Sequence, residues 1–266
     1  SMESLDTLLP LQWDVPFPPP SKHKFTFIDL FAGIGGFRIA FQKLGGKSVF
    51  SSEIDKYAQR TYEANFGEIP FGDITNINEK DIPRHDILLA GFPCQAFSIA
   101  GRQEGFEDTR GTLFFDIARI IKSRKPAAFF LENVKGLTHH NRGKTFNRIL
   151  EVLRKDLKYF VPEPKIINAK DFGRPQNRER VFIVGFRKDL KVTEFEFPNP
   201  MKKKVTFGDV KEKNPVSAKY YLSSRYLNTL RKHRKRHENK GNGFGYEIIH
   251  GDKIANAIVI GGMGKE

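Results

Sequence analysis

The chain has 266 residues, and 45 Lys and Arg against 31 Asp and Glu give it a formal net charge of +14, which favours a polyanionic partner. A single cysteine excludes internal disulfides and zinc clusters, as is typical of an intracellular protein. No apolar run is long enough to cross a bilayer, so we expect a cytoplasmic protein without membrane contact.

The first element predicted along the chain is a strand followed by a glycine turn and a helix. We expect residues 1–24 to be an N-terminal segment and linker, because Pro16 and Pro18 to Pro20 prevent a helix or an inner strand. Residues 25–31 are rich in aromatic and β-branched side chains, which predicts a strand. A glycine turn over 32–36 follows, and a helix with an apolar stripe then ends at Gly45.

The remaining chain alternates between strands and helices. Strands are predicted at 48–51, 86–90, 127–131 and 180–186, with a shorter one leading into Gly72. Helices are predicted around 58–65, 112–125 and 146–157 from apolar residues three and four apart. This alternation predicts an α/β fold with a mostly parallel sheet covered on both faces.

Polar residues cluster at or just past the carboxyl ends of the predicted strands, the edge at which open α/β sheets bind ligands. They are Asp29, Glu53, Asp73, Cys94 and Glu132. Cys94 follows Pro93 in a polar turn, whereas a structural cysteine usually lies inside an apolar run. We therefore interpret Cys94 as a candidate nucleophile.

The glycine turn lacks the third glycine of the dinucleotide fingerprint, and no phosphate-binding GxxxxGK[ST] loop is present. Glu53 is placed to accept hydrogen bonds from ribose hydroxyls, and Asp73 from an adenine amino group. These residues predict an adenosine-bearing ligand without a pyrophosphate. S-adenosylmethionine fits that description better than NAD or ATP.

Four segments then resemble, in order and spacing, the DNA cytosine-5 methyltransferases: Asp29–Phe37, Gly91–Ser98, Glu132–Val134 and Gln176–Arg180. The resemblance covers residues 25–186. It implies a Rossmann-like S-adenosylmethionine-dependent methyltransferase fold with a mixed seven-stranded sheet. It further implies a catalytic domain over residues 25–187 and a smaller, partial target-recognition domain over residues 188–266.

The resemblance also implies roles for individual residues. A cofactor site is expected at Phe31, Ala32, Gly33, Ile34, Gly35, Gly36, Glu53, Ile54, Asp73, Ile74, Pro93 and Leu113. Cys94 would add to carbon 6 of cytosine, while Glu132 holds a proton near ring nitrogen 3. Arg180 would bind oxygen 2, and Arg178 would support the nucleophile loop. The base that removes the proton from carbon 5 is left open, with a water as one candidate.

Double-stranded DNA is the expected partner, because the target carbon is buried in a stack and the base must be swung out. Contacts are expected from two runs of residues, for which solvated surface is the alternative: Gln95, Ser98, Arg102, Gln103 and Arg110 in a long polar lid, and Arg231, Arg234 and Arg236 in a basic segment. We expect a monomer associated with the nucleoid, and a cognate restriction endonuclease as a further partner in the cell.

Three alternatives remain open. A branch of the same family acts on transfer RNA, so an RNA cytosine-5 methyltransferase is the first. A catalytically impaired DNA-binding fragment is the second, because the sequence ends before two C-terminal segments that the resemblance implies; the intact Cys94, Glu132 and Arg180 argue against it. A hydride-transferring NAD enzyme is a distant third.

Overall fold

The computed structural model of the chain describes residues 15–94, 109, 111–243 and 246–257. The chain divides into two compact units, one formed by Ser1–Ile166 with Arg180–Phe197 and the other by Ile167–Glu179 with Pro198–Glu266. The expected boundary between residues 187 and 188 differs from this division. Residues 167–179 group with the C-terminal part because short strands pair within it, and residues 188–197 stay with the first unit.

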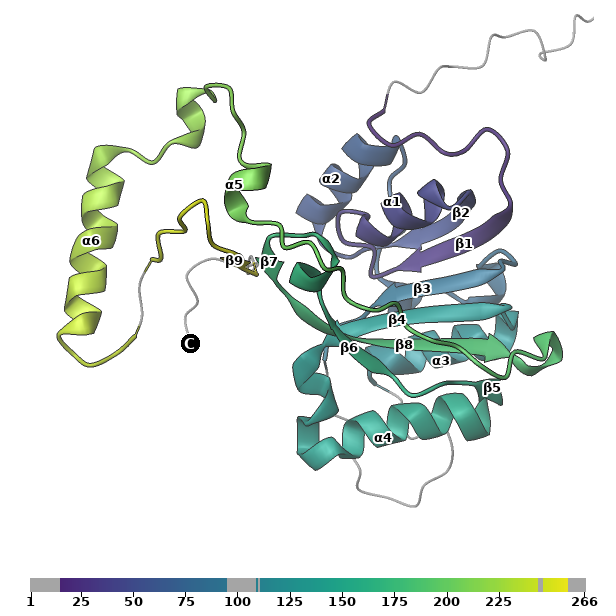
Figure 1. Cartoon of the computed structure of the whole chain (residues 1–266). Helices are drawn as coiled ribbons and strands as arrows, with labels where there is room; N and C mark the ends of the chain where they lie inside the picture. Colours follow the sequence, from purple (N-terminus) through teal and green to yellow (C-terminus); the bar gives the residue numbers. More distant parts are fainter. Residues whose placement is uncertain (1–14, 95–108, 110, 244–245, 258–266) are drawn as a thin grey trace, which may run out of the picture. The chain divides into compact units, whose positions relative to one another are not determined.

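The first unit is built on a mixed seven-stranded sheet of order β2-β1-β3-β4-β8-β5, with β6 paired to β8 (Figure 1). Strands β1 to β4 are mutually parallel, whereas β8 runs antiparallel to both β4 and β5. The strands are β1 (Phe25–Leu30), β2 (Gly46–Ser52), β3 (Ile87–Gly91), β4 (Ala128–Val134), β5 (Tyr159–Phe160), β6 (Lys165–Asn168) and β8 (Glu179–Arg187). The predicted mixed seven-stranded α/β sheet is confirmed.

Helices pack around this sheet: α1 (Gly36–Lys43), α2 (Lys56–Phe66), α3 (Leu113–Arg124) and α4 (Lys144–Glu151), which continues as a π-helical turn over Val152–Asp156. The Asp55 side chain accepts from the Ala58 N–H at the start of α2, and Gly67 ends that helix with a φ of 73°. Short 3₁₀ turns lie at Ile74–Asn76, Glu79–Asp81, Lys135–Thr138, His140–Gly143, Ala169–Phe172, Lys188–Leu190 and Ala218–Tyr220.

The core lies along the central strands. Ile28, Leu88 and Phe129 are fully buried in neighbouring strands, and Ile117 and Ile121 of α3 are buried with them. Strands covered on both faces are expected to be apolar throughout, which is why the runs 86–90 and 127–131 were recognisable as strands.

Two local expectations were wrong. The short strand before Gly72 is a single parallel bridge between Ser52 and Phe71, because Pro70 has no N–H to extend a ladder. Within the linker expected over residues 1–24, Phe17 is docked: its N–H donates to the Asn65 carbonyl at 3.1 Å and its ring lies 6.0 Å from that of Phe66.

The second unit contains a two-stranded parallel pair, β7 (Gln176–Asn177) with β9 (Ala255–Asn256). Two helices also belong to it, the short α5 (Phe207–Val210) and the basic α6 (Ser224–Glu238). The Ser223 hydroxyl caps α6 by accepting from the Tyr226 N–H. In the part of the chain that the structure describes, no helix combines the length and apolarity that crossing a membrane requires.

Candidate active site

The glycine loop after β1 is shaped by left-handed backbone conformations. Phe31, Gly33 and Gly35 have φ values of 53°, 57° and 94°. A Cβ at Gly35 would lie 2.1 Å from Cε2 of Phe66, so only glycine fits against α2 there. A Cβ at Gly33 would meet no atom within 4 Å, so the loop faces open space at that position.

Helix α2 and strand β2 hold the loop in place. The Asn65 side-chain amide donates to the Ile34 carbonyl at 2.9 Å. Glu53 at the end of β2 accepts from the Gly33 N–H at 2.7 Å through Oε2 and from the Asp55 N–H at 2.8 Å through Oε1. A carboxylate has about four acceptor positions, so Glu53 can still accept from ligand hydroxyls.

The other expected cofactor residues surround this loop in varied environments. Ala32 is buried, Phe31 is half-buried, and Gly36 opens α1 without a side-chain cap from Gly35. The apolar side chains of Ile34 and Ile54 are 58% and 67% exposed. Apolar side chains this exposed, beside a loop that faces open space, provide a surface on which a flat apolar group can pack.

Asp29 is the second-to-last residue of β1 and so lies at the strand end, as predicted. It is fully buried, and burial raises the pKa of its carboxyl well above the ordinary value despite the opposing charge of Arg38. Arg38 is itself buried, donates to Glu68 Oε2 at 2.6 Å and lies over the Phe66 ring at 4.5 Å. Asp29 and Arg38 therefore form a buried support beneath the glycine loop.

Asp73 and Ile74 are held by an arginine that sequence reasoning missed. The Asp73 side chain accepts from the Thr75 N–H at 2.9 Å and starts the 3₁₀ turn. Arg119 of α3 donates to the Ile74 carbonyl at 2.8 Å, to Glu79 Oε2 at 2.8 Å and to Asp116 Oδ1 at 2.9 Å. Burial raises the pKa of the Asp116 carboxyl. The only sequence signal for this anchor is the i,i+3 spacing of Asp116 and Arg119.

The nucleophile turn begins where β3 ends. Gly91 is in register with Glu132 of β4, and a Cβ at Gly91 would lie 3.2 Å from Glu132 Oε2. Cys94 is half-buried and packs against the core, while Pro93 before it is exposed. Burial raises the pKa of the Cys94 thiol, so the described structure does not support a nucleophile activated by a lowered resting pKa.

Glu132 is paired with Arg180 of β8, whose Nε lies 3.0 Å from Glu132 Oε1. Each side chain is 20% exposed, so the pair is largely screened from solvent.

Leu113, the first residue of α3, is half-buried, and α3 is capped by Thr112, whose hydroxyl accepts from the Phe115 N–H. Arg178 belongs to the other compact unit, where its N–H donates to Asn168 Oδ1 at 3.0 Å.

The expected DNA contacts divide into two groups. The group after the nucleophile lies outside the described residues: Gln95, Ser98, Arg102, Gln103 and Arg110. The basic run is helix α6, on which Arg231 and Arg236 are exposed. Arg234 instead donates to Glu238 Oε1 at 2.8 Å and to the Tyr246 carbonyl at 3.2 Å, and lies over the Tyr246 ring at 5.2 Å. These contacts make Arg234 an internal brace of the second unit.

The described residues contain no cluster of three or more His, Cys, Asp or Glu side chains that could bind a metal ion.

Comparison with known proteins agrees with this arrangement. The chain is 66% identical over 250 residues to the Type II methyltransferase M.HpaII of Haemophilus parainfluenzae, covering 93% of this chain and 70% of that protein. It is 54% identical over 230 residues to M.DsaV of Dactylococcopsis salina, covering 86% of this chain and 65% of that one. The chain thus spans roughly two thirds of these relatives' length.

The fold is also found in the crystal structure of the Dnmt2 methyltransferase of S. pombe, with a TM-score of 0.61 at 19% identity, over 87% of this chain and 70% of that one. The profile of the C-5 cytosine-specific DNA methylases matches residues 25–263. The chain therefore belongs to the C-5 cytosine-specific DNA methylase family.

Proposed function

We propose that this chain carries the catalytic unit that transfers a methyl group from S-adenosylmethionine to carbon 5 of a cytosine flipped out of double-stranded DNA. The observation that carries the proposal is the Glu132–Arg180 pair, which lies beside the turn that holds the only cysteine. An acid, a thiol and a guanidinium are the groups that activation of a pyrimidine ring needs.

The residues of the glycine loop fit the cofactor. Gly33 leaves room for close approach, and the uncapped start of α1 offers backbone N–H groups and a positive dipole end to a carboxylate. Glu53 retains acceptor positions for ribose hydroxyls, and the exposed Ile54 offers an apolar face to adenine. S-adenosylmethionine supplies the methyl group as an electrophile when it is bound.

The chain's own residues would activate carbon 5 of the cytosine for methylation. The Cys94 thiol loses its proton to water as its sulfur forms a bond to carbon 6. The electron pair displaced from the ring is neutralised at nitrogen 3 by a proton from Glu132, which Glu132 takes back when the adduct breaks down. Arg180 holds the Glu132 carboxyl and donates to oxygen 2 of the base. Carbon 5 thereby becomes the nucleophile. When it has gained the methyl group and lost its proton to a base, the carbon–sulfur bond breaks and Cys94 leaves.

The raised pKa of Cys94 favours one of the two ways of activating it. A thiol that is protonated at rest must lose its proton as the base binds, so activation is coupled to formation of the carbon–sulfur bond. We assign Arg178 to support of the nucleophile loop. Arg231 and Arg236, exposed on α6, are assigned to phosphate contact.

The cellular setting is proposed on the same basis. The relatives are named as Type II methyltransferases, which supports a restriction-modification setting with a cognate endonuclease. We propose that the protein acts as a monomer on the nucleoid, because flipping and modifying one base requires one active site.

The test is covalent trapping by the full-length protein. Duplex DNA of random sequence, synthesised with 5-fluorocytosine, blocks removal of the group on carbon 5 and should trap an adduct that resists denaturing gel electrophoresis in the presence of S-adenosylmethionine. The Cys94→Ser variant should give none, and Arg60→Ala, an exposed change on α2, should match the parent.

A parent protein that forms no adduct on any such duplex would overturn the proposal. Transfer RNA containing 5-fluorocytosine serves as the parallel substrate. Adduct formation on the RNA but not on the duplex would reassign the substrate while preserving the role of Cys94.

A further inference from the structure

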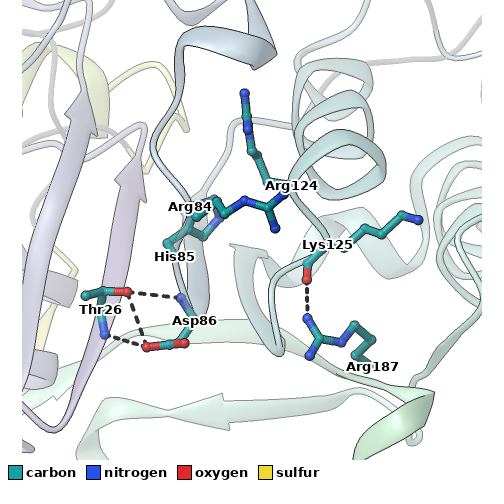
Figure 2. A pocket seen from close by; sticks show the side chains of 7 residues that line it. All are labelled: Thr26, Arg84, His85, Asp86, Arg124, Lys125 and Arg187. Carbon is teal, nitrogen blue, oxygen red and sulfur yellow. Dashed lines mark hydrogen bonds between the residues drawn. The ribbon is translucent and has the colours of Figure 1, made fainter.

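A pocket of about 520 Å³ lies at the edge of the sheet opposite the nucleophile turn. Figure 2 shows the side chains that line it. Thr26 stands near the start of β1, Asp86 immediately before β3, and Arg187 at the end of the antiparallel β8. A six-residue strand is about 20 Å long, so this pocket and the glycine loop lie at opposite ends of β1. Its lining residues are Thr26, Arg84, His85, Asp86, Arg124, Lys125 and Arg187.

The lining is strongly cationic. Arg187 is neutralised by Asp189, to which its Nε donates at 2.6 Å, but no carboxylate among the described residues is paired with the other cations. Arg124 donates to the carbonyls of Glu79 and Lys80, which orient the guanidinium without cancelling its charge. Arg84 and Lys125 are exposed. Arg84, Arg124 and Lys125 therefore have no ion-pair partner among the described residues, and with Asp86 as the one carboxylate of the lining the pocket keeps a net positive charge.

The one carboxylate in the lining, that of Asp86, accepts hydrogen bonds from within the protein. Asp86 Oδ2 accepts from the Thr26 N–H at 2.8 Å and from the Thr26 hydroxyl at 3.2 Å (Figure 2). These bonds tie the start of β1 to the residue before β3. Asp86 thus has a local structural role at this edge, and its negative charge offsets only part of the positive charge of the lining.

The pocket lining also contains a buried histidine, His85. His85 is 7% exposed, and its Nδ1 donates to the Pro83 carbonyl at 2.8 Å. Its Nε2 is buried and has no hydrogen-bond partner in the described structure. This nitrogen has almost no accessible surface, so it lies behind the pocket wall and is not assigned a contact with the ligand.

These features identify the chemistry of the ligand. Arginine guanidinium groups match phosphate oxygens bidentately, and lysine supplies a further point charge. The volume is that of a small-molecule site, while the lining contains no aromatic ring except the imidazole of His85 to stack on a nucleobase.

We propose that this pocket is a binding site for a small di- or triphosphate anion, held by Arg84, Arg124 and Lys125. The site is separate from methyl transfer and does not depend on it. DNA held at the carboxyl edge of the sheet would not reach this pocket, because the strands separate the two edges.

The test is calorimetric titration of the full chain with sodium tripolyphosphate at about 50 mM salt, a concentration that limits screening. Arg84→Glu and Lys125→Glu should each weaken binding at this site at least about tenfold, because each change replaces an attraction with a repulsion. Arg60→Glu on α2 makes the same charge change outside the pocket and should leave the affinity unchanged. Melting temperatures of all variants check that each is folded.

Three results would overturn the proposal: no binding of tripolyphosphate by the parent chain, affinity unchanged in both pocket variants, or equal weakening in Arg60→Glu. A duplex oligonucleotide is titrated in parallel. Weaker duplex binding in Arg84→Glu without any tripolyphosphate binding would assign the pocket to a nucleic-acid backbone instead. Adduct formation with 5-fluorocytosine DNA should be intact in both pocket variants, which separates this site from the methyl-transfer proposal.

Discussion

Glu132 Oε1 and Arg180 Nε lie 3.0 Å apart across the neighbouring strands β4 and β8. Register places Val134 opposite Arg180, so Glu132 and Arg180 are diagonal neighbours on the same face of the sheet. The arginine therefore fixes the orientation of the carboxyl, and the rigid sheet fixes the arginine.

Glu132→Gln should lower the rate of methyl transfer by about 10²- to 10⁴-fold, because the amide cannot deliver a proton to the ring. Formation of the Cys94 adduct should slow with it. Single-turnover assays with radiolabelled methyl donor measure the rate, and a gel assay measures the adduct. Arg180→Lys is the companion variant and should lose less activity than Glu132→Gln, because it keeps the charge but not the planar group. An unimpaired Glu132→Gln would contradict the assigned role.

Alkylation of Cys94 should require a higher pH than alkylation of a free cysteine peptide. Burial raises the pKa of this thiol, and only the thiolate reacts, so the reactive fraction rises through a midpoint above the ordinary value of about 8.5. Iodoacetamide labelling followed by mass spectrometry is unambiguous here because the chain has one cysteine. The urea-unfolded chain is the control. A midpoint at or below that of the unfolded chain would show that the folded state activates the thiol at rest.

Gly35→Ala should lower the free energy of unfolding by about 2–4 kcal/mol, because a Cβ there meets the Phe66 ring at 2.1 Å and the φ of 94° is strained. Gly36→Ala is the matched control: its Cβ meets nothing within 4 Å, and stability should change by less than about 1 kcal/mol. Urea denaturation measures both.

The same pair of variants tests the cofactor loop. Gly36→Ala should weaken S-adenosylmethionine binding in calorimetry although its stability is preserved. If Gly36→Ala binds the cofactor as well as the parent does, Gly36 does not line the cofactor site.

Arg119→Ala should cost about 2–3 kcal/mol of unfolding free energy, because three charge-assisted hydrogen bonds are lost and the buried Asp116 carboxyl loses its arginine partner. It should also weaken S-adenosylmethionine binding, since Arg119 holds the Asp73–Glu79 segment. Arg154→Ala is the control, because Arg154 also bonds a carbonyl and a carboxylate, those of Val161 and Glu163, but lies away from the Asp73–Glu79 segment. Equal cofactor affinity in both variants would exclude a positioning role for Arg119.

The sheet was predictable because its central strands are apolar on both faces and are separated by glycine turns. The glycine loop and the nucleophile turn were recognisable because each is marked by a short run of adjacent residues in the sequence. The pairing of Glu132 with Arg180 required the register of β4 with β8, which no local pattern encodes. Asp29 lies at the carboxyl end of β1 as predicted, but its complete burial depends on the three-dimensional packing around the strand, which the sequence does not reveal.

Helix α6 escaped prediction because its sequence is dominated by charge. Its half-buried face is Leu230, His233, Arg234 and His237, at helical spacing but with only one apolar member. A search for apolar stripes cannot detect such a face. The boundaries of the second unit were not predicted for a different reason. Its paired strands come from distant parts of the chain and have two residues each, which is too short for a recognisable strand pattern in the sequence.

That pair of strands has a consequence for engineering. Gln176 is in register with Ala255 and Asn177 with Asn256, so the second unit is assembled from two stretches of sequence that are separated by β8. A chimaera that exchanges only the C-terminal stretch between relatives would bring in a foreign β9 while keeping the native β7. Grafts should therefore carry residues 167–179 together with the stretch from 198 onward.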